Sequence, residues 1–266
     1  MRTILIMTTT LLTLTACGGT STGSAGTGGP GTPGGVTAMP GTLSGQVLDE
    51  RGTPVQDALI ITEPASYTGA VFTRTDAQGR YRTVELNTNV APYYAYAYKQ
   101  VTYNGRAYCV RLAGETGTEY DAYNPKAGAV KNWRWRLSGP ADSSDAVWGG
   151  TVKLENVAQL RDDPAYVEWN VIVELTFTPA GPLIDGSVGD TVVLQGQREA
   201  AFKDIPVGKY TVTAREVQAD GTRTLLRLNT KYSEAGLAQQ ITMMFNGFES
   251  CGHMGTFPST MLFIAR

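Results

Sequence analysis

The sequence predicts an all-β fold made of two tandem β-sandwiches, preceded by a non-globular N-terminal stretch. Three observations predict it. From residue 43 onward, short runs rich in Val, Ile, Thr and Tyr alternate in polarity. Gly, Pro, Asn and Asp separate these runs at a spacing typical of sandwiches, and no run sustains an apolar period of 3.6 residues. Residues 139–150, GPADSSDAVWGG, are rich in turn residues and mark the expected boundary between the two sandwiches.

The first sixteen residues have the pattern of a secretory signal. Their apolar run is interrupted by threonines and is shorter than the roughly 20 residues that a membrane-spanning helix needs. It ends in Leu14-Thr15-Ala16-Cys17, which resembles a bacterial lipobox. The resemblance implies cleavage before Cys17 and a lipid on its thiol. An ordinary secretory peptide with an incidental cysteine is the alternative.

Residues 17–40 are expected to form the lipidated cysteine and a flexible tether. From residue 18 to residue 35 the chain reads GGTSTGSAGTGGPGTPGG, which has no charge and no large apolar side chain. Such a segment buries too little surface to offset the entropy lost on ordering. Its nominal G-x-G-x-x-G match lacks the flanking strand and helix of a dinucleotide site, so we interpret it as accidental.

Residues 41–140 are expected to form the first sandwich, and they carry a two-part motif. Alternation from residue 43 to 47 predicts a strand, residues 49–52 a turn, and residues 76–79 a hairpin turn. The motif residues are Gly45, Val47, Asp49, Gly52, Pro54, Val55 and Ala58, then Thr73, Thr75, Asp76, Gly79 and Tyr81. This pattern resembles the carboxypeptidase regulatory-like domain, a transthyretin-like β-sandwich. The resemblance concerns a non-catalytic appendage and implies no peptidase residues.

Residues 147–266 are expected to form the second sandwich, transthyretin-like or Ig-like. The run from Phe202 to Ala214, FKDIPVGKYTVTA, resembles a strand-turn-strand unit of related surface sandwiches. Further strands are expected at residues 166–177, 190–194, 223–228, 240–245 and 260–264, and a helical turn within residues 157–163.

Cysteine parity predicts one disulfide. The chain has three cysteines, and lipidation of Cys17 would leave Cys109 and Cys251 as a pair outside the cytoplasm, where disulfides persist. We therefore predict the bond Cys109–Cys251.

Aromatic residues in two strands form a candidate contact face. Tyr94, Tyr96 and Tyr98 share one face of a strand, and Trp133 and Trp135 repeat the arrangement. Such rings suit stacking on sugars, pigments or a protein partner. The alternative is that these rings fill a sandwich core, since aromatic residues are generally enriched in strands.

Few residues offer catalytic chemistry. His253 is the single histidine of the sequence, and neither a G-x-S-x-G elbow nor a phosphate loop occurs. The adjacent acids Asp49 and Glu50 are interpreted as a solvated turn. Cys251, His253 and Met254 supply soft ligands that suit copper. A disulfide would remove Cys251 from that set, so we expect no metal cofactor and keep copper as the alternative.

These observations predict a lipid-anchored protein of the outer membrane or cell surface. Its net charge of −2 argues against a nucleic-acid partner. We expect a non-catalytic binding or assembly module whose partners are the membrane, through the N-terminal lipid, and other envelope proteins or glycans. The alternatives are a copper-binding redox subunit that handles superoxide and a glycan- or pigment-binding lipoprotein.

Overall fold

The computed structural model describes residues 36–141, 145–247, 249–252 and 258–266. These residues form β-strands and two single-turn 3₁₀ helices, η1 (Thr88–Val90) and η2 (Pro125–Ala127). The predicted all-β fold is confirmed. The signal peptide and most of the tether, including Cys17, lie outside the described residues.

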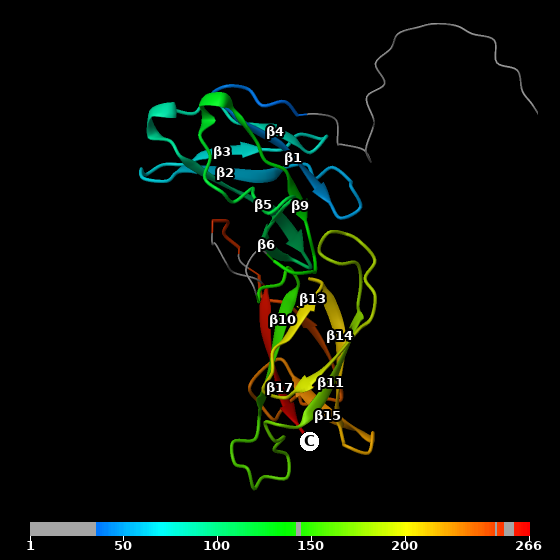
Figure 1. Ribbon diagram of the computed structural model, residues 1–266. Coiled ribbons are helices and arrows are strands. Elements are labelled where there is room, and N and C mark those ends of the chain that lie inside the picture. The colour runs from blue at the N-terminus through cyan, green and yellow to red at the C-terminus, as the bar shows by residue number, and fades with distance from the viewer. Residues whose placement is uncertain (1–35, 142–144, 248, 253–257) are drawn as a thin grey trace, which may run out of the picture. The chain divides into compact units, whose positions relative to one another are not determined.

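Residues 36–141, here called the first β-region, form two sheets (Figure 1). One sheet has the order β4-β1-β9-β7, with β8 paired to β1, and the other has the order β3-β2-β5-β6. The strands are β1 (Leu43–Asp49), β2 (Ala58–Pro64), β3 (Val71–Arg74), β4 (Arg80–Arg82), β5 (Tyr93–Tyr103), β6 (Arg106–Arg111), β7 (Ala113–Gly114), β8 (Ala129–Val130) and β9 (Trp133–Trp135).

The core of this region consists of side chains from both sheets. Leu43 and Val47 of β1 and Ile60 of β2 are fully buried in one cluster with Ala95 and Ala97 of β5. On β5 the buried alanines alternate with the tyrosines. Because successive side chains of a strand point to opposite faces, the core takes the alanine side and leaves the tyrosine side of β5 facing away.

The described residues between 145 and 266, here called the second β-region, form one continuously hydrogen-bonded sheet. Its order is β12-β11-β14-β15-β17-β10-β13, with β16 paired to β14. The strands are β10 (Gly150–Asn156), β11 (Ile172–Pro179), β12 (Val192–Gln197), β13 (Phe202–Ile205), β14 (Lys209–Val217), β15 (Arg223–Asn229), β16 (Gln240–Met244) and β17 (Ser259–Ala265).

This sheet curls around buried side chains that belong to the same continuous core cluster as those of the first β-region. The long strand β14 pairs with β16 through residues 209–213 and with β15 through residues 214–217, so it serves two neighbours. The end strands β12 and β13 also contact each other. The enclosed core includes Phe177, Tyr210 and Phe245, whose rings meet edge to face.

The two β-regions belong to one compact unit, Val36–Arg266. Tyr103 links them: its hydroxyl donates a hydrogen bond to the Pro182 carbonyl and accepts one from the Lys209 amide, each at 2.8 Å. Nearby, the Tyr108 hydroxyl donates to the Phe245 carbonyl at 3.0 Å. These contacts cross the boundary that the sequence predicts between the two sandwiches. The domain limits expected from the sequence remain a prediction.

Two local expectations are wrong. Residues 157–163 form bends and a turn, with the Asp163 amide donating to the Leu160 carbonyl, and no helix. The strand expected from residue 166 begins only at Ile172, in β11. The reason is that Asn156 takes the place of a strand partner: its side-chain amide bonds both the amide and the carbonyl of Val167.

Candidate functional site

The motif residues of the first β-region build two turns. Asp49 accepts hydrogen bonds at Oδ1 from the amides of Arg51 and Thr53, at 2.9 and 2.7 Å, and its Oδ2 pairs with the Arg51 guanidinium. Gly52 has a φ of +82°, a conformation that favours glycine. Asp49 is buried, so the expectation of a solvated acid is wrong at this residue. Its role is to close the turn.

The second motif turn uses the same chemistry. Asp76 Oδ1 accepts hydrogen bonds from the amides of Gln78 and Arg80, each at 2.9 Å. A Cβ on Gly79 would lie 2.3 Å from the Val47 carbonyl oxygen, so only glycine lets the turn approach β1 this closely. These motif residues shape the fold.

The tyrosine-bearing face of the sheet β3-β2-β5-β6 lies outside the main core. Register places Phe72 beside Ile61 and Ile61 beside Tyr96, so the three side chains form a row across β3, β2 and β5. Phe72 is 64% exposed and Tyr94 is 37% exposed. We call Phe72, Tyr94 and Tyr96 the aromatic face. Sequence reasoning missed Phe72, although its alternation with the motif residue Thr73 was a usable signal.

The other end of this sheet face is covered. Ile61, Tyr98 and Cys109 form a small buried cluster, with Tyr96 and Cys251 packed against it. Tyr98 is only 2% exposed, and burial raises the pKa of its phenol and that of Tyr96. Tyr98 therefore contributes to the cluster that holds the disulfide, and only Tyr94 and part of Tyr96 remain open to contact.

Trp133 and Trp135 do not form a contact face. They are 0% and 7% exposed and lie in the main core. The Tyr120 ring packs edge to face on Trp133, at a centroid distance of 5.4 Å. The alternation of β9 places both indoles on one face as expected, but that face points inward. Their interpretation as contact residues is therefore wrong.

Cys109 and Cys251 are joined in a disulfide, the pair that cysteine parity predicts. Their Cα atoms lie 5.3 Å apart and 142 positions apart in the chain. The bond ties β6 of the first β-region to the segment between β16 and β17 of the second. A bonded Cys251 has no thiolate to offer a metal, and His253 and Met254 lie outside the described residues. The copper hypothesis stays a prediction.

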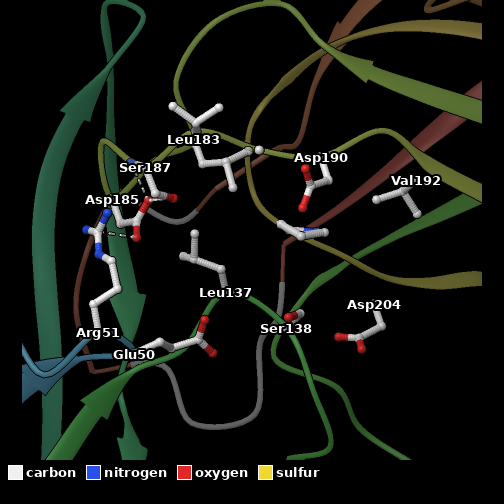
Figure 2. Close-up of a pocket in the computed structure, with 13 residues that line it drawn as sticks. Glu50, Arg51, Leu137, Ser138, Leu183, Asp185, Ser187, Asp190, Val192 and Asp204 are labelled. Carbon is white, nitrogen blue, oxygen red and sulfur yellow. Dashed lines mark hydrogen bonds and ion pairs between the residues drawn. The ribbon is translucent and has the colours of Figure 1, made fainter.

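An acidic cleft of about 430 Å³ lies where residues of both β-regions meet (Figure 2). Glu50 and Arg51 come from the turn after β1, and Asp185 and Asp190 come from the loop before β12. The Arg51 guanidinium bridges to Asp185 at 3.7 Å while it holds Asp49 at 2.9 Å. Arg51 thus connects the two β-regions electrostatically.

In the cleft, the carboxylates of Glu50 and Asp185 repel each other. Burial raises the pKa of the Glu50 carboxyl, Arg136 offsets part of that rise, and negative Asp185 adds to it. For Asp49, burial acts to raise the pKa, but the amides of Thr53 and Arg51 and the Arg51 guanidinium outweigh it and lower the pKa.

The carboxylates of the cleft do not gather on one point. Figure 2 shows Asp190 and Asp204 on the side away from Asp185 and Arg51. Asp204 instead accepts hydrogen bonds from the amides of Gly139 and Gly149, which fixes the connection between the two β-regions. Among the residues that the structure describes, no three His, Cys, Asp or Glu side chains are arranged to hold a metal ion.

The described part of the chain contains no helix long and apolar enough to cross a membrane. No protein-family model matches the chain. No curated protein matches it either.

Three solved structures show distant similarity. The Bacillus anthracis TIE protein aligns over 85% of this chain and 34% of its own, at 11% identity and a TM-score of 0.33. A streptococcal ancillary pilin aligns over 85% and 69%, at 12% identity and a TM-score of 0.24. The major pilin subunit of Bacillus cereus aligns over 86% and 100%, at 8% identity and a TM-score of 0.24. This chain spans about a third of the first of them, and the fold class given above rests on the strands themselves.

Proposed function

We propose that this protein is a lipid-anchored component of the bacterial cell envelope that acts by contact, without turning over a substrate. The anchor is a diacylglycerol on Cys17, supported by the lipobox-like Leu14-Thr15-Ala16-Cys17. The tether of about 20 Gly-, Ser- and Thr-rich residues behind it has a root-mean-square reach of about 25 Å. That reach lets the folded part search for partners near the membrane surface.

The location that we propose is the outer membrane or the cell surface. Gly18 follows the cysteine proposed to carry the lipid. In familiar Gram-negative lipoproteins, an Asp at this position favours retention at the inner membrane, and this chain resembles those that lack it. The resemblance of Leu14–Cys17 to a lipobox supports a location outside the cytoplasm. The disulfide supports the same location, because disulfides persist there.

The observation that carries the proposal is the aromatic face. Phe72 is 64% and Tyr94 37% exposed on one sheet face, next to the partly buried Tyr96. Exposed aromatic rings offer apolar contact area to a partner, and protein–protein interfaces are enriched in aromatic residues. The face is held rigid because its strands are paired on both sides of β2 and because the disulfide cluster fixes its other end.

The first β-region is proposed to be a carboxypeptidase regulatory-like domain. Support comes from its motif, whose Asp49 and Asp76 each close a turn by accepting backbone amides. In that assignment the region is a rigid platform, and Phe72 and Tyr94 would contact a partner from its sheet β3-β2-β5-β6.

The experiment is affinity capture of partners from native envelope with full-length protein. We compare wild type with Phe72→Ser/Tyr94→Ser, which removes the exposed rings and leaves the buried Tyr98 in place. The proposal expects the variant to fold and to lose the partner that wild type retains. Leu225→Ser removes an exposed apolar side chain from β15 and is the matched control, expected to retain it.

One outcome would contradict the aromatic face as the contact surface, and another would identify a glycan as its partner. Equal retention of the same partner by wild type and by the aromatic variant would exclude the aromatic face. Saturable binding to a deproteinised glycan fraction, lost in the same variant, would favour the glycan-binding alternative over a protein partner.

A further inference from the structure

The structure has a second cavity, a groove of about 450 Å³ that is basic where the first cleft is acidic. Its walls come from the start of β6, the start of β14, the loop after β15, and strands β16 and β17. Three cations line it: Arg106, Lys209 and Lys231. Among the residues that the structure describes, no carboxylate lines it.

The three cations lie apart from the carboxylates of the described residues. Within the residues that the structure describes, none of the three makes an ion pair. Burial raises the pKa of Tyr108, and the charge of Arg106 opposes that rise. Register puts Lys153 beside Met261 and Glu155 beside Phe263, so the flanking charges of β10 offset each other. A chain of net charge −2 thus carries a local concentration of positive charge.

Part of the groove lining is apolar. Register places Lys209 directly beside Met244, and Met261 of β17 is 42% exposed where it lines the groove. Phe263, on the same side of β17 as Met261, also lines it. Thioethers are flexible and polarizable and adapt to irregular hydrocarbon shapes. Positive charge and an adaptable apolar surface therefore lie side by side.

Hydroxyl groups complete the lining. Thr242, beside Thr211 in register, and Thr230 both line the groove, are exposed and offer hydroxyl donors. A phosphate accepts several such bonds together with contacts from Lys and Arg. A free phosphate would contact the cations and hydroxyls but leave the Met244 and Met261 side chains uncovered.

We propose that this groove binds the headgroup region of an anionic phospholipid. Arg106, Lys209 and Lys231 contact the phosphodiester, and the glycerol and first acyl carbons cover Met244 and Met261. The ligand class follows from the pairing of the two surfaces, because a nucleic acid or a simple polyanion has no hydrocarbon to place on the methionines. The site is separate from the aromatic face, so either can fail without the other.

The test uses full-length protein in a fixed concentration of non-ionic detergent, with ¹³C-methyl methionine labelling. Dihexanoyl phosphatidylglycerol is titrated and compared with dihexanoyl phosphatidylcholine, glycerol phosphate and inorganic phosphate. The expected result is saturable binding of phosphatidylglycerol with shifts at the Met244 and Met261 methyls. Glycerol phosphate and phosphate are expected to bind more weakly and to leave those methyls unshifted.

Variants separate the two parts of the site. Lys209→Gln and Lys231→Gln are each expected to weaken phosphatidylglycerol binding about fivefold, the effect of removing one cation near an anionic headgroup. Lys126→Gln, an exposed lysine that lies outside the groove, is the matched control and should leave binding unchanged. Met261→Ser should weaken the binding of phosphatidylglycerol and leave the binding of glycerol phosphate unchanged.

Each opposite result overturns the proposal. Equal affinity for phosphatidylcholine would remove charge recognition. Equal affinity for inorganic phosphate, without methyl shifts, would leave a phosphate site that does not recognise lipid. Absence of saturable binding, or equal binding by the Lys209 and Lys231 variants in folded protein, would remove the site.

Discussion

Trp133 donates a hydrogen bond from its indole Nε1 to the Tyr81 hydroxyl, at 3.1 Å, in the interior of the first β-region. The same hydroxyl donates to the Lys131 carbonyl at 2.7 Å. Burial raises the pKa of Tyr81 far above its ordinary value, so the hydroxyl stays protonated. Tyr81, the last residue of the motif, thus links β4 to β9 across the intervening strand β1. The motif requires the hydroxyl oxygen of this tyrosine as well as its ring.

Tyr81→Phe is expected to destabilise the fold. The substitution keeps the ring but leaves the Trp133 N–H and the Lys131 carbonyl without this partner, and each unsatisfied buried group costs about 1–3 kcal/mol. Chemical denaturation measures the change in the free energy of unfolding. Tyr94→Phe, at an exposed tyrosine, is the matched control and should change it little. Equal stability of Tyr81→Phe and wild type would contradict this role.

Removing the disulfide is expected to lower stability strongly. Cys109→Ala/Cys251→Ala opens a loop of 142 residues, for which the chain-entropy model gives a loss of up to about 5 kcal/mol. Urea unfolding of wild type and variant gives the difference. Peptide mapping without reductant should recover Cys109 joined to Cys251 in wild type. Finding two free thiols in protein from its native compartment would contradict the pairing and would favour the copper hypothesis.

Asp49→Asn is expected to change how stability depends on pH. The folded-state pKa of Asp49 lies below its ordinary value of 3.8, so the stabilisation is present above that pH and is lost as the pH falls through the folded-state pKa. The variant should therefore be less stable than wild type at neutral pH, and the gap should narrow below pH 3.8. Denaturant unfolding from pH 2 to pH 7 measures it. A gap that stays constant with pH would refute the carboxylate's role.

Cys17→Ser is expected to release the protein from membranes or to leave it unprocessed. Membrane fractionation measures the release, and intact-mass spectrometry of the wild type should find the added acyl chains. The conservative variant Gly18→Ala leaves the thiol in place and should still carry lipid. A wild-type mass without acyl chains would refute the anchor.

The sequence predicted the strands and turns better than it predicted which faces are buried. Alternation at Tyr94, Tyr96 and Tyr98 and at Trp133 and Trp135 correctly groups each set on one face, because side chains alternate along a strand. The same alternation is symmetric and does not say which face turns inward. Burial is decided by the facing sheet, which takes the alanines of β5 and the tryptophans of β9.

The candidate sites depend on pairings that are distant in sequence. Phe72 meets Tyr96 only through Ile61 of the strand between them. The basic groove joins Arg106 to Lys209 and Lys231, more than a hundred residues further along the chain. Local patterns carry no information about such register, whereas the turns at Asp49 and Asp76 are closed by residues within four positions and were predictable.

The central claim is that the protein works by contact through the aromatic face, and site-specific photocrosslinking in intact cells tests it most directly. A photoreactive phenylalanine is placed at Phe72, at Tyr94 or, as a control, at the exposed Val188 of the second β-region. The account predicts the same discrete adduct from positions 72 and 94 and none from position 188. No adduct from positions 72 and 94, or an identical adduct from all three, would contradict it.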